Sequence, residues 1–231
     1  MTQTSRHSLL LLLAVIASLA YLGSEFLRPF PLSYAIKATP AIALALWVYS
    51  NTSHPKRMWL MGAFVFAAIG DVILDFGHFP MLAQGLMVFA LTQLALINLM
   101  RQFPANRPRW QWTSLAPGTP IFLWLIWPYL DDRAPLLAAY SVLLTLMVMM
   151  AFRANLNKRT QVGALLFLIS DSLIAIDTFV WHSQLGMSTI FATYFTAIIL
   201  LAHGLVDALN HASQESDTAT EIGKRSKVIS N

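Results

Sequence analysis

Long apolar stretches separated by short polar breaks are the dominant pattern of this chain. Most of them approach the ~20 residues that a helix needs to cross a hydrocarbon core of ~30 Å. A helix also satisfies its own backbone polar groups in lipid, so the pattern predicts an all-α, integral membrane bundle of eight transmembrane helices. The eight stretches are Ser8–Gly23, Leu32–Ser50, Met58–Phe76, Met81–Met100, Trp112–Leu130, Pro135–Phe152, Gln161–Val180 and Ser188–Asp207.

The first stretch allows a second interpretation. Arg6, the leucine run after it and the sequence Ser18-Leu19-Ala20 also fit a signal peptide with a small-residue cleavage site. We favour a retained helix over a signal peptide, because losing this helix would leave an odd number of helices.

The fifth stretch and the end of the chain depart from the regular pattern. Residues 117–128 include three prolines and a glycine, so the fifth helix is expected to be kinked or partly re-entrant. After His211 the sequence is polar and of mixed charge, which is typical of a disordered tail. The sequence thus predicts a transmembrane domain over residues 1–210 and a disordered cytoplasmic tail over residues 211–231.

The composition agrees with a membrane protein. The chain of 231 residues is 57% hydrophobic and only 11% charged, whereas soluble domains carry about 25% charged residues. Its lack of cysteine excludes disulfides and thiolate metal sites. Basic runs with interleaved aromatics are also absent, so we expect the lipid bilayer and not a nucleic acid as the partner. The oligomeric state stays open.

The basic residues predict the orientation of the chain. When the chain ends and alternate loops are taken together, twelve of the 15 Lys and Arg residues fall on one side, and only Arg28 and Arg133 fall on the other. By the positive-inside rule both termini are cytoplasmic, and the expected location is the cell (inner) membrane. The twelve are Arg6, Lys56, Arg57, Arg101, Arg107, Arg109, Arg153, Lys158, Arg159, Lys224, Arg225 and Lys227.

Several ionisable residues lie inside the apolar stretches. Asp71 and Asp171 are expected in the middle or outer half of the membrane, with Asp75 four residues beyond Asp71 on the same helix face. Lys37 and Tyr194 fall in the outer half of their own helices. A carboxylate at this depth costs roughly 2.5–3.5 kcal/mol and usually marks function. These five residues are therefore expected to converge on one layer and to form a functional cavity; a structural ion pair through Lys37 is the alternative.

Other polar residues carry weaker signals. His78 and His182 follow the two Asp-bearing stretches, but their spacing matches no zinc motif, so neither a metal nor another cofactor is expected. Asp177 is six residues from Asp171, on a different face and nearer the rim. Gln93 is the kind of residue that forms hydrogen bonds between helices, and His203 is expected to pack or form hydrogen bonds inside the last helix.

The two Asp-bearing stretches resemble each other. Gly70-Asp71-Val72-Ile73-Leu74 and Ser170-Asp171-Ser172-Leu173-Ile174 share a small residue, an Asp, any residue and two apolar residues, and both helices run in the same direction. This similarity suggests two parallel four-helix repeats, each of which contributes one Asp.

The order of these motifs resembles the YhhN-like lysoplasmalogenase family over nearly the whole chain, from about Leu9 to Leu209. The motifs are Lys37-Ala38-Thr39-Pro40, Gly70 to Leu74, Ser170 to Ala175, and Thr193-Tyr194. The fourth and last helices depart from the family pattern. Where the family commonly has a His and then a Tyr, Phe89 is followed here by Gln93 and Leu96, and Ile198 stands where the family has a Gln.

The resemblance implies hydrolysis of the vinyl ether bond of lysoplasmalogens, which gives a fatty aldehyde and a glycerophospho-headgroup. Such a reaction needs a proton delivered to carbon, followed by attack of water on an oxocarbenium-like cation. A carboxyl group held away from water can stay protonated as the general acid, and a second, ionised carboxylate can stabilise the cation and activate water. Asp71 and Asp171 would take these two roles, in either order.

Four further residues complete the expected site. Lys37 would hold the substrate phosphate or tune one Asp, Ser170 and Tyr194 would orient water or the carboxylates, and Asp75 would join them in binding the lysophospholipid. The main alternative is a proton- or ion-coupled transporter that uses the same Asp and Lys residues as a relay. A scaffold protein with buried ion pairs is the third possibility.

Overall fold

The computed structural model describes residues 3–28, 30–77, 79–105, 107–154, 156–181 and 186–229. Within these ranges the regular structure is entirely helical, which confirms the all-α prediction. Short 3₁₀ turns at 25–27, 79–81, 127–129 and 131–133 join several of the helices. The helices are α1 (Gln3–Gly23), α2 (Ser33–Asn51), α3 (Arg57–Gly77), α4 (Leu82–Met100), α5 (Arg109–Thr113), α6 (Gly118–Ile126), α7 (Ala134–Arg153), α8 (Lys158–Ile176) with a π-helical turn at Asp177–Trp181, and α9 (Gly186–Ile229).

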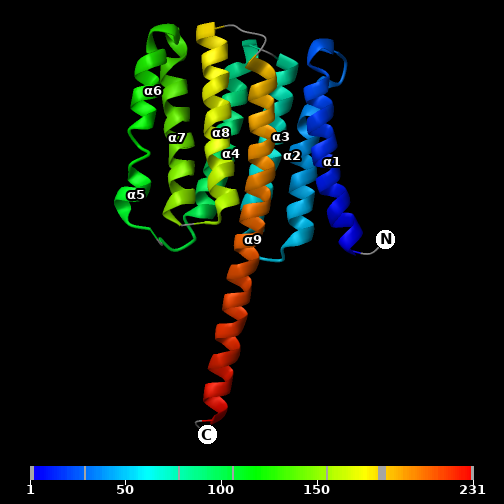
Figure 1. Cartoon of the computed structure of the whole chain (residues 1–231), viewed down its shortest axis with the longest axis vertical. Helices are drawn as coiled ribbons and strands as arrows, with labels where there is room; N and C mark the ends of the chain where they lie inside the picture. Colours follow the sequence, from blue (N-terminus) through cyan, green and yellow to red (C-terminus); the bar gives the residue numbers. More distant parts are fainter. Residues whose placement is uncertain are drawn as a thin grey trace.

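The helices stand side by side as a bundle, and both chain ends leave it at the same end (Figure 1). This end also holds the start of α3 at Arg57, the end of α7 at Arg153 and the start of α8 at Lys158. The turn that carries Glu25 and Arg28, between α1 and α2, lies at the opposite end. The basic residues therefore gather at the end with the termini, as the charge pattern requires; the assignment of that end to the cytoplasm stays a prediction.

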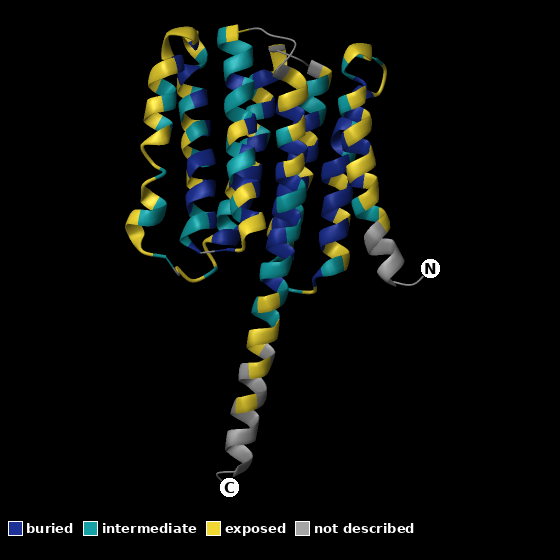
Figure 2. Cartoon of the chain, viewed as in Figure 1, coloured by how far each residue is buried: buried dark blue, intermediate teal, exposed yellow. Residues whose placement is uncertain are grey.

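The surface of the bundle is suited to lipid. Five helices of the described part of the chain are long and apolar enough to cross a membrane: Arg57–Phe76, Leu82–Met100, Asp131–Arg153, Lys158–Trp181 and Met187–Ser216. Buried residues line the inner faces of the helices and exposed residues the outer faces (Figure 2). Large apolar side chains such as Leu19, Leu46 and Ile69 are among the exposed ones. The count of eight crossings and the two repeats stay predictions.

The fifth stretch is interrupted, as its prolines predict. It forms two short helices, α5 and α6, which are joined by a turn at residues 114–117. Because proline removes a backbone donor and clashes with the preceding turn, the prolines of this segment favour a break in the helix. α6 packs mainly against α7 and exposes Trp124, and the 3₁₀ turn that follows it exposes Trp127. This loosely attached helix covers the pocket described below.

The most extensive helix pair is α8 with α9. Asn157 caps α8 by accepting a hydrogen bond from the backbone N–H of Thr160 (3.0 Å), and its own amide donates to the carbonyl of Gly204 (2.7 Å). A Cβ added at Gly204 would lie 2.3 Å from Thr160 Oγ1, so only glycine allows this approach. The close contact fixes α8, and with it Asp171, against α9.

The end of the chain differs from the expected tail. α9 continues as a helix through residues 211–229, where the sequence predicts a disordered segment. A helix that is already nucleated propagates readily through residues such as Ala, Glu and Lys, which are good helix formers. The division of the chain into a transmembrane domain and a tail stays a prediction.

Candidate functional site

Lys37, Asp71 and Tyr194 meet in the middle of the bundle. Lys37 Nζ on α2 lies 3.9 Å from Asp71 Oδ1 on α3, and the Tyr194 hydroxyl on α9 donates to Asp71 Oδ2 at 2.7 Å. All three residues are at most 5% exposed. The charge of Asp71 is thus balanced by a cation and a hydrogen-bond donor, in a place that is closed to water.

Asp75 lies beside this group and joins it to α1. The Tyr21 and Ser33 hydroxyls both donate to the Asp75 carboxylate. The cations of Arg28 and Lys37 both pack on the rings of Tyr21 and Phe191. The guanidinium of Arg28 lies 4.2 Å from the centre of the Tyr21 ring, and Lys37 Nζ lies 4.9 Å from the centre of the Phe191 ring. We call the set Tyr21, Lys37, Asp71, Asp75 and Tyr194 the charged cluster. It fills the space between α1, α2, α3 and α9.

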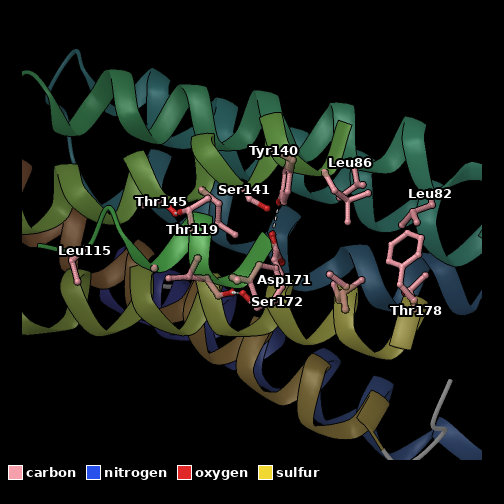
Figure 3. Close-up of a pocket in the computed structure, with 18 residues that line it drawn as sticks. Leu82, Leu86, Leu115, Thr119, Tyr140, Ser141, Thr145, Asp171, Ser172 and Thr178 are labelled. Carbon is pink, nitrogen blue, oxygen red and sulfur yellow. Dashed lines mark hydrogen bonds between the residues drawn. The ribbon is translucent and has the colours of Figure 1, made fainter. Parts of the chain in front are cut away.

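Asp171 has different surroundings. It receives a hydrogen bond from the Tyr140 hydroxyl on α7, and Figure 3 shows both side chains pointing into a pocket. Among the described residues, Asp171 forms no ion pair, whereas Asp71 pairs with Lys37. The two carboxylates still lie close enough for their charges to repel each other.

The pocket lies between α4, α6, α7 and α8 and is mainly apolar. Figure 3 shows Leu82 and Leu86 toward one end and Leu115 toward the other, with Asp171 between them. The volume of the pocket is about 170 Å³, whereas sites that enclose a drug-sized molecule run from about 300 to 1,000 Å³. The pocket can therefore enclose the reacting part of a lipid but not a whole lipid chain.

An aromatic wall stands beside Asp71. The rings of Phe89, Phe167 and Tyr194 contact one another edge to face, with centres 5.7 to 6.4 Å apart. Phe89 also packs so closely on α3 that a Cβ at Gly70 would lie 2.6 Å from its ring. This explains the small residue before Asp71 in structural terms.

One of the predicted site residues, Ser170, has another neighbour than expected. Ser170 is fully buried and donates to the backbone carbonyl of Ile190 at 3.1 Å, so its hydroxyl ties α8 to α9 instead of donating to a carboxylate. Asp177 begins the π-helical turn after α8. His78 and His182 lie outside the described residues. Within the described ranges, no group of three His, Cys, Asp or Glu side chains could hold a metal.

The five residues that were expected to share one layer thus fall into two sets. Lys37, Asp71, Asp75 and Tyr194 belong to the charged cluster, while Asp171 lies on the pocket. The sequence reasoning missed Tyr140 and Tyr21, the two tyrosines that donate to Asp171 and Asp75. A signal was available for Tyr140, a phenol inside the apolar helix α7, but not for Tyr21, which lies near the end of α1 at Gly23, where tyrosine is usual.

Comparisons of the sequence with known proteins all point to one family. The sequence model of the YhhN family matches residues 32–205. A protein named Lysoplasmalogenase from Mycobacterium bovis is 32% identical over 202 residues, which cover 83% of this chain and 77% of the relative. Lysoplasmalogenase TMEM86B of Homo sapiens is 30% identical and covers 72% of each chain. Lysoplasmalogenase TMEM86A of Bos taurus is 26% identical, covering 78% of this chain and 80% of the relative. No solved structure matches.

Proposed function

Because the chain belongs to the YhhN family, we propose that it is a lysoplasmalogenase. It hydrolyses the vinyl ether bond of 1-alkenyl lysophospholipids and releases a fatty aldehyde and a glycerophospho-headgroup. The relatives that carry this name match most of the chain. The observation that carries the proposal is the Asp171–Tyr140 pair on an apolar pocket that opens within the bundle. We further propose that the protein acts in the cell membrane, where its substrate resides.

Asp171 is the general acid. A carboxyl group in apolar surroundings, with no cation beside it, can hold its proton until a substrate takes it. The proton goes to the outer vinyl carbon, the double-bond electrons form the new C–H bond, and the ether oxygen shares its lone pair with the inner carbon. An oxocarbenium ion results, with its positive charge beside the Asp171 carboxylate that has just formed.

Water completes the reaction. Its oxygen bonds to the inner carbon while a proton passes to Asp171, which restores the acid and leaves a hemiacetal. The hemiacetal then breaks its bond to the glycerol oxygen, which takes up the hydroxyl proton. One water is consumed, and Tyr140 holds Asp171 in position through its hydrogen bond.

Asp71 supplies a fixed negative charge. Lys37 and Tyr194 hold it in place, and its charge reaches Asp171. In a medium of low dielectric such a charge lowers the energy of a cation formed nearby. Lys37 therefore tunes Asp71 rather than binding phosphate, Tyr194 orients the carboxylate, and Asp75 and Ser170 support the helices around the site.

The experiment supplies purified protein in detergent with a lysoplasmalogen and follows aldehyde release. In D₂O, protonation at carbon places one deuterium on the carbon next to the aldehyde carbonyl. A lysophospholipid with an ester in place of the vinyl ether serves as the control substrate, since it has no double bond to protonate.

We expect the wild type to release labelled aldehyde and the Asp171→Asn variant to release almost none. Failure of the folded wild type to turn over the vinyl ether would overturn the proposal and favour the transporter, which uses the same Asp residues without hydrolysis. Undiminished turnover by folded Asp171→Asn would reject the assignment of the acid.

A further inference from the structure

Gln93 on α4 is a buried polar residue without partners. It is 0% exposed, and neither its amide nitrogen nor its amide oxygen forms a hydrogen bond among the described residues. Leaving such a group unpaired in an apolar interior costs roughly 1–3 kcal/mol on the scale of protein mutations. An amide without partners in a tightly packed bundle is available to bind a molecule that the neighbouring helices do not supply.

The neighbours of Gln93 connect it to the proposed acid. Its amide approaches the hydroxyl of Tyr140 without completing a hydrogen bond. Tyr140 in turn donates to Asp171 and lines the pocket. Gln93 is not among the residues that line the pocket, so Tyr140 is the side chain that connects it to Asp171 and to the pocket.

A side-chain amide offers two donors and an acceptor. Buried waters typically make about three hydrogen bonds to polar groups that would otherwise be unsatisfied. The Gln93 amide and the oxygen of the Tyr140 hydroxyl provide such groups next to Asp171. A water bound there is held within reach of the carboxylate that must accept its proton.

From this arrangement we propose that Gln93 is a positioning residue for the hydrolytic water. The amide holds the water beside Tyr140, and the water attacks the inner carbon of the oxocarbenium ion as Asp171 takes its proton. The inference rests on the proposed function. Without the held water, the cation lasts longer and can return its proton to the Asp171 carboxylate, which re-forms the vinyl ether.

This reversal provides the test. In D₂O the acid carries deuterium, so each return to substrate can leave deuterium on the outer vinyl carbon. Unreacted lysoplasmalogen is recovered from partial reactions of the wild type, Gln93→Leu and Thr92→Val, and analysed by mass spectrometry. Thr92 is a matched control, because it neighbours Gln93, is 2% exposed and also has an unpartnered hydroxyl.

We expect Gln93→Leu to release aldehyde roughly 10²-fold more slowly, as misplacing a reactant does, and to leave deuterium in the recovered substrate. Wild type and Thr92→Val should leave none. Gln93→His, which keeps a donor and an acceptor, should restore part of the rate and suppress the exchange. The unfolding temperature of each variant is measured in detergent, and a loss of rate is assigned to Gln93 only in variants that unfold near the wild-type temperature, so it cannot come from a weakened fold.

Two results would overturn the inference. One is a wild-type rate without exchange in Gln93→Leu; the other is a slow rate without exchange, which would mean that protonation itself had failed. If Gln93→Leu does not fold, Gln93→Met decides by the same criteria. Absence of aldehyde from the wild type would instead reject the proposed function, so the two failures are distinguishable.

Discussion

The charged cluster and the pocket contain the same pair of groups in opposite surroundings. In each, a tyrosine hydroxyl donates to an aspartate: Tyr194 to Asp71 and Tyr140 to Asp171. Asp71 is 1% exposed and faces Lys37, whereas Asp171 is partly exposed on an apolar pocket. A paired, enclosed carboxylate suits a fixed charge, and an open one without a cation suits proton transfer. Surroundings, rather than residue type, separate the two roles.

The largest effect that separates them is expected from Asp171→Asn. Losing a positioned general acid typically costs 10²–10⁴-fold in rate, so we expect aldehyde release to fall by about 10³-fold. Asparagine still accepts the Tyr140 hydrogen bond, so the unfolding temperature should change little. Asp177→Asn, on the turn that follows the same helix, serves as the control and should keep wild-type activity.

The charged cluster should show its largest effect in stability. Lys37→Met leaves Asp71 without its cation, and breaking a buried pair in this way costs about 3–5 kcal/mol. Thermal unfolding in detergent should therefore occur at a markedly lower temperature. The double variant Lys37→Met/Asp71→Asn, which removes both charges, should recover most of that loss. If Lys37→Met were as stable as the wild type, Asp71 would not depend on this pair.

The two tyrosine donors sharpen the comparison. Tyr140→Phe removes the hydrogen bond that orients Asp171, and we expect kcat to fall about tenfold, the equivalent of ~1.4 kcal/mol, while KM changes little. Tyr21→Phe removes the matching bond to Asp75 and should reduce stability by about 1.5–3 kcal/mol with kcat nearly unchanged. A loss of stability without a loss of kcat in Tyr140→Phe, together with a loss of kcat in Tyr21→Phe, would contradict the division into two regions.

The smallest effect concerns substrate fit. Ala175 lines the pocket and is 8% exposed, so Ala175→Phe should fill part of the space and raise KM several-fold, by about 1 kcal/mol of lost binding. Ile169 on the same helix is 46% exposed on the outer surface. Ile169→Phe should leave KM unchanged. Equal KM values for the two variants would show that substrate does not enter this pocket.

Much of the fold could be read from the sequence, because the pattern of apolar stretches and charges specifies helices, their order and their direction. The break at Pro117 also followed from residue type. An ion pair through Lys37 was the alternative interpretation, and only the structure shows that its partner is Asp71. The separation of Asp171 from the charged cluster did not follow from the sequence. Position along a helix gives depth, but the direction in which a side chain points depends on how neighbouring helices pack.

The unpaired amide of Gln93 could not be predicted from the sequence either. A glutamine in an apolar helix usually bonds to another helix, and only the packing around it shows that neither amide atom has a partner. Likewise, the sequence could not show that Ser170 bonds to the Ile190 carbonyl on α9 rather than to Asp171.

One measurement tests the central claim, that Asp171 and not Asp71 delivers the proton. Aldehyde release is compared between Asp171→Asn and the double variant Lys37→Met/Asp71→Asn, both folded and at saturating lysoplasmalogen. We expect the first to be about 10³-fold slower than the wild type and the second, which loses a stabilising charge but keeps the acid, to be at most about 10²-fold slower. The reverse order, with Asp171→Asn the faster enzyme, would contradict the claim.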